Sequence, residues 1–214
     1  MYNIKKDSIP LDQPIFKGNE ARYLSDCVKT GWISSQGKYV SKFEKKFSKY
    51  VSQKYSASTA NGTSALIIAL QALDLKSTDE VIVPSLTFSA SVFSITMAGA
   101  KVVFADSIPG KLDVDPEDIL KKITKKTKAI MVVHLYGRPA NMDSIVKIAK
   151  KHKLFIIEDC AECLGATYSR KKTGSFGDIS CFSFHNKLIA TGEGGMITTN
   201  SEKLHLKVLD LKNP

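Results

Sequence analysis

The sequence predicts an α/β fold with a mostly parallel central sheet that is covered by helices on both faces. From about residue 60 to residue 160, short apolar segments with almost no charge alternate with segments of helical character. Strands buried on both faces of a parallel sheet have this uninterrupted apolar character. A chain of 214 residues, 43% of them hydrophobic, is long enough to bury the core of such a domain.

The individual elements follow from local sequence signals. A buried helix is expected over 65–73 because the polar turn 61–64 precedes a continuous apolar run. Another helix opens at Asp115-Pro116-Glu117-Asp118, since proline and acidic residues favour the first turn. Further helices are expected over 89–98 and 143–151 and from Ser201 onward, and strands over 81–83, 101–105, 129–133, 154–157 and 196–199.

Composition excludes several classes of protein. The apolar fraction is too high for a disordered chain, and no apolar run approaches the roughly 20 residues of a membrane helix. The first seven residues are polar and lack the apolar core of a secretory signal. We therefore expect a cytoplasmic protein that has no membrane partner.

The net charge of +10 comes from 28 lysines and three arginines that are scattered along the chain. Nucleic-acid sites concentrate basic residues and favour arginine, so we expect no nucleic-acid partner. The lysine clusters within 121–128 and 147–153 are expected to be solvated helix faces and turns. The charge favours attraction of a phosphorylated small substrate.

The four cysteines are expected to be free thiols. Cys160 and Cys163 form a CxxC pair, but no second pair and no histidine pair follows at the spacing of a zinc site. Buried thiols in a reducing compartment are therefore the favoured interpretation, and no metal is expected.

Three features point to one kind of cofactor. The Asn61-Gly62-Thr63-Ser64 turn before a helix can cradle a phosphate, although an ordinary N-cap is an alternative. Asp159 ends an apolar strand, where it could hold a protonated heterocycle nitrogen, while Glu158 points to the opposite face. Lys187 lies in an apolar stretch, where a lysine becomes nucleophilic, although a surface lysine is equally compatible. Together these are the contributions that pyridoxal 5'-phosphate (PLP) requires from a protein.

Five motifs follow one another along the chain. They are Gly31-Trp32-Ile33-Ser34-Ser35-Gln36-Gly37, 61–66, 84–88, 158–162, and Lys187 with Gly192-Glu193-Gly194-Gly195. In this order they resemble the motifs of the DegT/DnrJ/EryC1/StrS sugar aminotransferases, which have the aspartate aminotransferase fold (type I), and the resemblance runs from about Ile9 to the end of the chain. It implies that residues 1–214 are an N-terminal segment plus the large PLP-binding domain, without the small C-terminal domain.

The resemblance also implies a role for each matched residue. Lys187 would bind the cofactor covalently and move the substrate proton, and Asp159 would pair with the ring nitrogen. The phosphate would be bound by Gly62, Thr63, Ser64 and Ser183, the ring would stack on Phe88, the cofactor hydroxyl would lie near Glu162, and the substrate would contact Ser34, Ser35 and His185.

The implied reaction is transfer of an amino group from glutamate to a 4-keto-6-deoxy nucleotide sugar of the perosamine type, in a homodimer with shared active sites. A related dehydratase branch carries histidine at the lysine position, so Lys187 favours the aminotransferases. Two alternatives stay open. The chain could be a truncated or non-catalytic PLP-binding fragment, or it could act on a UDP-linked or dTDP-linked keto sugar.

Overall fold

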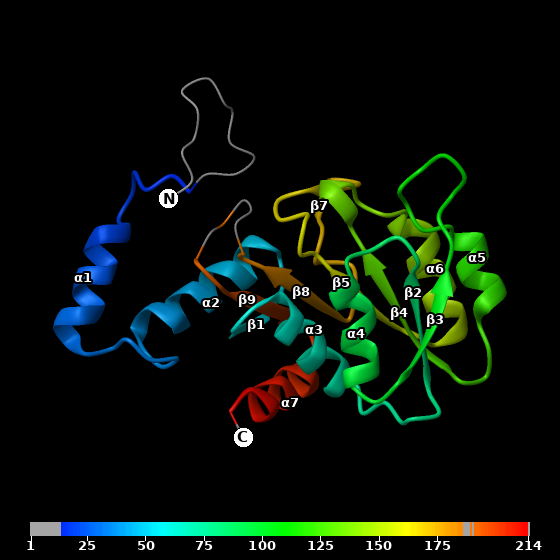
Figure 1. Ribbon diagram of the computed structural model, residues 1–214, viewed down its shortest axis with the longest axis horizontal. Helices are drawn as coiled ribbons and strands as arrows, with labels where there is room; N and C mark the ends of the chain where they lie inside the picture. The colour runs from blue at the N-terminus through cyan, green and yellow to red at the C-terminus, as the bar shows by residue number, and fades with distance from the viewer. Residues whose placement is uncertain (1–13, 186–188, 190, 214) are drawn as a thin grey trace.

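The computed structural model describes residues 14–185, 189 and 191–213, and it has a seven-stranded mixed sheet at its centre (Figure 1). Strands β3, β2, β4, β5 and β8 pair in parallel in this spatial order, whereas β9 runs antiparallel to both β8 and β1. The strand order is β1 (Tyr55–Thr59), β9 (Gly195–Thr199), β8 (Ile179–Ser183), β5 (Phe155–Asp159), β4 (Thr127–Val133), β2 (Glu80–Pro84) and β3 (Lys101–Ala105).

Helices cover both faces of this sheet, as the sequence predicts. On one face, α3 (Gly62–Gln71), α4 (Ser89–Met97) and α7 (Glu202–Lys212) contribute to a core with Ala129 and Met131 of β4. On the other face, α5 (Pro116–Lys122) and α6 (Met142–His152) contribute to a core with Ile130 and Val132 of the same strand. The alternation along β4 places successive side chains in opposite cores, which is why the strand is apolar throughout.

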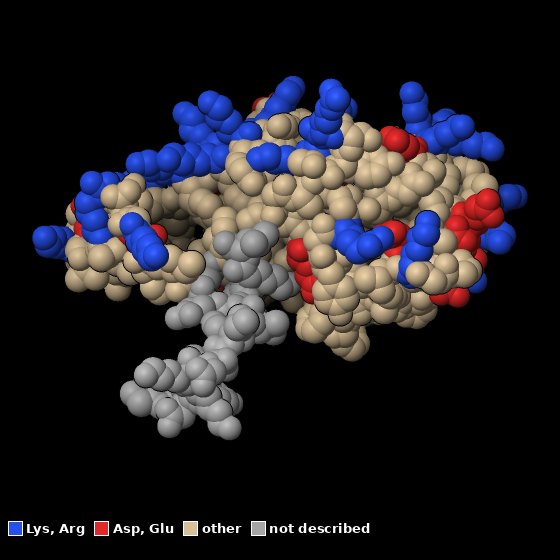
Figure 2. Space-filling model, turned by 90° about the horizontal axis from the view of Figure 1, so that it is seen from above, with Lys and Arg blue, Asp and Glu red and all other residues tan. Residues whose placement is uncertain are grey.

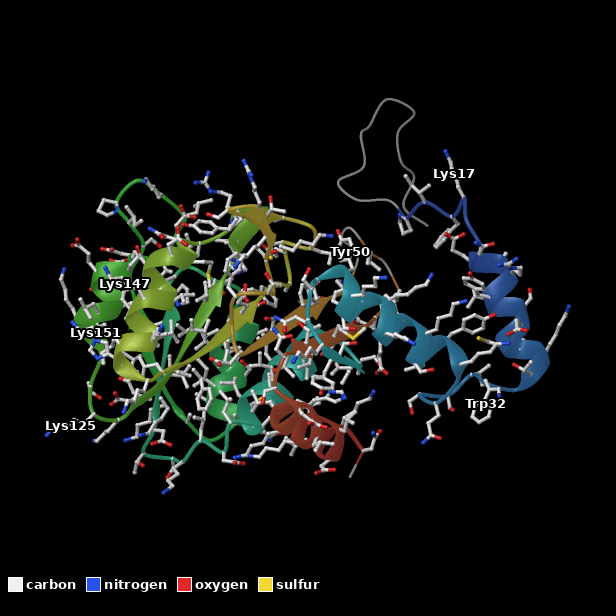
Figure 3. The ribbon with its side chains drawn as sticks, turned by 180° about the vertical axis from the view of Figure 1, so that it is seen from behind. Lys17, Trp32, Tyr50, Lys125, Lys147 and Lys151 are labelled. Carbon is white, nitrogen blue, oxygen red and sulfur yellow. The ribbon has the colours of Figure 1, made fainter. Side chains whose placement is uncertain are left out.

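The first two helices form an arm beside the sheet. Helix α2 (Lys38–Tyr50) packs on the sheet end through Phe47, which contacts the rings of Phe182 and Phe184. Helix α1 (Glu20–Thr30) has no buried residue, and it stands apart from the sheet (Figure 1). Trp32, at the outer end of this arm in Figure 3, is 53% exposed.

Every expected helix and strand between 65 and 212 is present, with boundaries that shift by a few residues. Several observed elements had not been predicted. Strand β1 has the polar sequence YSAST with only Ala57 buried, and β8 lies in the apolar stretch that leads to Lys187. The other elements beyond the prediction are α1, α2, the 3₁₀ turn η1 (Leu135–Gly137) and the hairpin of β6 (Thr167–Tyr168) and β7 (Lys171–Lys172).

The basic residues lie on the surface. Figure 2 shows Lys and Arg spread along one long edge of the molecule, and Lys125, Lys147 and Lys151 project outward at one end in Figure 3. All described lysines of the two predicted clusters are exposed, as expected for solvated helix faces. Among the described residues, no helix has the length and apolar character needed to cross a membrane.

Candidate active site

A cavity of about 430 Å³ lies where α3 begins and where strands β4, β5 and β8 end. The carboxyl ends of neighbouring parallel strands are the usual ligand-binding edge of such a sheet. Seven residues of the predicted site line this cavity together, although they come from four separate stretches of chain. They are Gly62, Thr63, Phe88, Asp159, Glu162, Ser183 and His185.

The start of α3 combines an N-cap with an open helix end. The Asn61 side chain accepts a hydrogen bond from the Ser64 backbone N–H at 2.8 Å, so the ordinary cap that the sequence allowed is present. Ser64 does not line the cavity, whereas Gly62 and Thr63 do. The positive end of the helix dipole therefore faces the cavity beside the Thr63 hydroxyl.

Gly62 allows α3 to approach β8 closely. A Cβ atom at this position would lie 2.7 Å from Cβ of Ser183 and 3.2 Å from its Oγ. Contacts this short require displacement of the neighbouring backbone or side chain. The glycine thus brings the helix start and the Ser183 hydroxyl to the same corner of the cavity.

Asp159 ends β5 and is 5% exposed. Its Oδ2 accepts a hydrogen bond from Ser91 Oγ at 2.8 Å, and its Oδ1 accepts one from the Ala161 backbone N–H at 3.1 Å. These contacts fix a carboxylate at the cavity wall. It can pair there with a protonated nitrogen of a bound ligand.

Glu158 points to the opposite face of β5, as strand alternation predicts. Its carboxylate accepts hydrogen bonds from the backbone N–H groups of Gly174, Phe176 and Gly177 at 2.6–2.8 Å and contacts His134 Nε2 at 3.0 Å. Burial would raise the pKa of Glu158, but the hydrogen bonds from His134 and the backbone outweigh it and lower the pKa. This carboxylate therefore holds the loop at 174–177 and does not reach the cavity.

Two further contacts join the loops at the cavity edge. Glu162 Oε2 accepts a hydrogen bond from the Tyr136 backbone N–H at 2.9 Å, which ties the turn after β5 to the loop after β4. His185 Nδ1 and Glu193 Oε1 are 2.8 Å apart, and both residues line the cavity. Glu193 had not been predicted as a site residue, although it lies in the glycine-rich motif that follows Lys187. Phe88, which precedes α4, is 71% exposed.

Besides Ser64, two described residues of the predicted site do not line the cavity. Ser34 and Ser35 lie exposed in the connection between α1 and α2, and neither lines the cavity. Lys187 lies outside the described residues. The described residues that flank it, Ser183, His185 and Glu193, all line the cavity.

The cysteines are free, as the sequence predicts, and Cys160, Cys163 and Cys181 are buried. Potential ligand atoms of His134, Cys160 and Cys163 lie within 4.8 Å of one another, although His134 is distant in sequence from the CxxC pair. Both ring nitrogens of His134 already have partners: Nε2 contacts Glu158, and Nδ1 accepts from the Ala140 backbone N–H at 3.1 Å. The Cys163 thiol donates to Thr173 Oγ1. His134 and the Cys163 thiol thus already have hydrogen-bond partners within the chain.

Comparison with known proteins assigns the family. The family model of the DegT/DnrJ/EryC1/StrS aminotransferase family matches residues 14–214. The chain belongs to this family. Among family relatives, it is 50% identical to the GDP-perosamine synthase of Escherichia coli O157:H7 and 47% identical to that of Vibrio cholerae. These matches cover 95% and 96% of the chain and 56% of each relative.

A solved structure shows the same relation. The E. coli GDP-4-keto-6-deoxy-D-mannose-3-dehydratase with bound hydrated PLP superposes with a TM-score of 0.89 at 32% identity, over 94% of the chain and 54% of that protein. The chain therefore spans about half the length of these DegT/DnrJ/EryC1/StrS family relatives. The predicted fold class is confirmed by this agreement.

Proposed function

We propose that the chain is the large PLP-binding domain, with an N-terminal segment, of a sugar aminotransferase. The observation that carries the proposal is the cavity, because one space is lined by an open helix end, hydroxyl groups and a buried carboxylate. The helix end and the hydroxyl groups are the partners that a phosphate needs, and the buried carboxylate is the partner that a protonated ring nitrogen needs. Family membership supports the same cofactor.

The cavity residues fit the cofactor on their chemistry. The corner at Gly62 would be filled by any larger side chain, and it has the α3 N-terminus, Thr63 and Ser183 around it, which suits a phosphate. Asp159 is the buried carboxylate of the lining, which suits the ring nitrogen. Glu162 and the exposed ring of Phe88 are further lining groups, which suit the hydroxyl and the ring face.

When bound, PLP supplies an electron sink and carries the amino group between the two substrates. The chain's own residues bind and orient the cofactor. Asp159 keeps the proton on the ring nitrogen, and the α3 N-terminus, Thr63 and Ser183 anchor the phosphate. The resemblance assigns to the Lys187 amino group the covalent attachment of the cofactor and the movement of the substrate proton.

For the substrates, we propose glutamate as amino donor and a GDP-linked 4-keto-6-deoxy sugar as acceptor. The support is the identity of 47–50% to two GDP-perosamine synthases. Incubation with PLP, ¹⁵N-labelled glutamate and GDP-4-keto-6-deoxymannose is expected to give a ¹⁵N-labelled amino sugar by mass spectrometry. UDP-linked and dTDP-linked keto sugars are the matched competitors. An amino sugar formed only from one of these would overturn the choice of GDP.

A second candidate function is cofactor binding without turnover. It is favoured by the fact that the chain spans only about half the length of its relatives. Under this alternative the chain binds PLP in the same cavity, but glutamate yields no 2-oxoglutarate. The labelled-glutamate experiment separates the two, since only an aminotransferase releases that product.

We also propose that the protein is a homodimer. Six large apolar side chains on the N-terminal arm are 53–79% exposed, and α1 buries no residue of its own. Isolated helices of this length are unstable in water, so the apolar arm needs a covering surface. Sedimentation equilibrium is expected to give twice the mass of the 23.5 kDa chain, and a strictly monomeric mass at micromolar concentration would contradict this proposal. The arm residues are Ile15, Phe16, Leu24, Val28, Trp32 and Ile33.

A further inference from the structure

Ser91 is a buried polar residue of α4 that the proposed chemistry does not yet use. The residue is 1% exposed, and its Oγ donates to Asp159 Oδ2 at 2.8 Å. A second hydroxyl, Thr87 Oγ1, lies 2.8 Å from Ser91 Oγ, and Thr87 lines the cavity. The two hydroxyls and the carboxylate therefore form one continuous chain of hydrogen bonds.

The donor and acceptor of each of these hydrogen bonds follow from the number of hydroxyl protons. An ionised carboxylate can only accept, so the single Ser91 hydroxyl proton must point to Asp159. The hydrogen bond between the two hydroxyls then requires the Thr87 proton, which points to Ser91. Donation from Thr87 polarises the Ser91 hydroxyl toward the carboxylate, because linked hydrogen bonds strengthen one another.

Ser91 and Ala161 hold different oxygens of the same carboxylate. Ser91 Oγ contacts Oδ2, and the Ala161 backbone N–H contacts Oδ1 at 3.1 Å. Two donors on two oxygens fix both the position and the plane of the carboxylate. The Ala161 donor is a backbone group that every residue would supply, whereas the hydroxyl donor depends on the side chain at position 91.

We propose that Ser91 is a positioning residue for the cofactor. It holds the Asp159 carboxylate in the orientation that meets the ring nitrogen of PLP, and Thr87 orients the Ser91 hydroxyl. This inference rests on the proposed function, because it needs PLP in the cavity. It assigns a role in cofactor binding to a residue of α4, a helix that contains none of the family motifs.

The Ser91→Ala variant removes the donor and leaves the Thr87 hydroxyl without its acceptor at position 91. We expect PLP to bind about tenfold more weakly, because the carboxylate that meets the ring nitrogen loses a charge-assisted hydrogen bond. The matched control is Ser94→Ala on the same helix. Ser94 is equally buried, but its hydroxyl donates to the Ser91 carbonyl and makes no contact with Asp159 that the structure describes.

The deciding probe is 1-deazapyridoxal phosphate, in which carbon replaces the ring nitrogen. Affinities of the wild-type chain, Ser91→Ala and Ser94→Ala are measured for PLP and for the analogue by absorbance titration. A residue that acts through Asp159 on the ring nitrogen affects only PLP, so the tenfold loss is expected to disappear with the analogue. Ser91→Cys retains a weak donor of similar size, and an intermediate PLP affinity is expected. Thermal melting of each variant reports its folding.

The outcomes separate this inference from the proposed function. Equal PLP affinities for Ser91→Ala and Ser94→Ala, or the same loss with PLP and with the analogue, would overturn the positioning role alone. A wild-type chain that binds no PLP would overturn both the positioning role and the proposed function. A loss confined to PLP and to substitutions at position 91 would support the inference.

Discussion

Replacement of Lys187 by alanine is expected to abolish covalent attachment of PLP and to reduce amino-group transfer by at least a thousandfold. The proposed reaction needs an amine that bonds to the cofactor and then moves a proton, and methyl side chains do neither. The flanking residues Ser183, His185 and Glu193 line the cavity. Borohydride reduction followed by peptide mass spectrometry is expected to show the adduct at position 187 in the wild-type chain and to show none in the variant.

Lys150→Ala is the matched control for this experiment. Lys150 is an exposed residue of α6 and belongs to the lysine-rich surface. Its loss should leave the adduct and the transfer unchanged. If the Lys187→Ala chain still carries a stoichiometric adduct, or if the label is spread over surface lysines in the wild-type chain, the assignment of Lys187 is wrong.

The second large effect is expected on stability. Glu158→Gln should lower the free energy of unfolding by about 3–5 kcal/mol at pH 7, because it removes the charge from a buried hydrogen-bonded pair. The new amide NH₂ would replace one carboxylate oxygen and would face either the Gly174 N–H, which donates to Oε2, or the Phe176 and Gly177 N–H groups, which donate to Oε1. Urea denaturation followed by circular dichroism measures this loss. Glu117→Gln, an exposed change in the first turn of α5, should cost less than about 0.5 kcal/mol.

The difference in unfolding free energy between the wild-type and Glu158→Gln chains is expected to depend on pH. The pKa of Glu158 in the folded chain lies below its ordinary value of 4.5, so the ionised form stabilises the fold. This contribution is complete above that pH and is lost as the pH falls through the folded-state pKa. The difference in stability between the wild-type and Glu158→Gln chains should therefore shrink in acid. A constant difference from pH 7 into this acid range, or equal stabilities at pH 7, would contradict the role of Glu158.

Local periodicity accounts for what could be predicted from the sequence. Strand alternation placed Glu158 and Asp159 on opposite faces, and their separate partners at 174–177 and on α4 confirm it. The apolar strands and capped helices were recognisable because their signals lie within a few residues. The same holds for Gly62 and Thr63, which the N-cap pattern brings to a helix start.

Long-range pairing accounts for what could not be predicted. Strand β1 is polar and short, and its pairing with β9 joins segments about 140 residues apart, so no local pattern marks it. His134 is fully buried against Glu158 and lies beside the CxxC pair, which is distant from it in sequence. The hydroxyl of Ser91 could not be connected to Asp159 from sequence, because α4 carries several small hydroxyl residues and no local pattern distinguishes Ser91 from the others.

The central claim, that this chain binds PLP and accepts an amino group from glutamate, has one direct measurement. The wild-type chain is loaded with PLP, and glutamate is added without any sugar substrate. We expect one equivalent of 2-oxoglutarate per chain and complete conversion of PLP to pyridoxamine phosphate, followed by absorbance and by chromatography of the released cofactor. PLP that binds but stays unchanged in the presence of glutamate, with no 2-oxoglutarate formed, would contradict it.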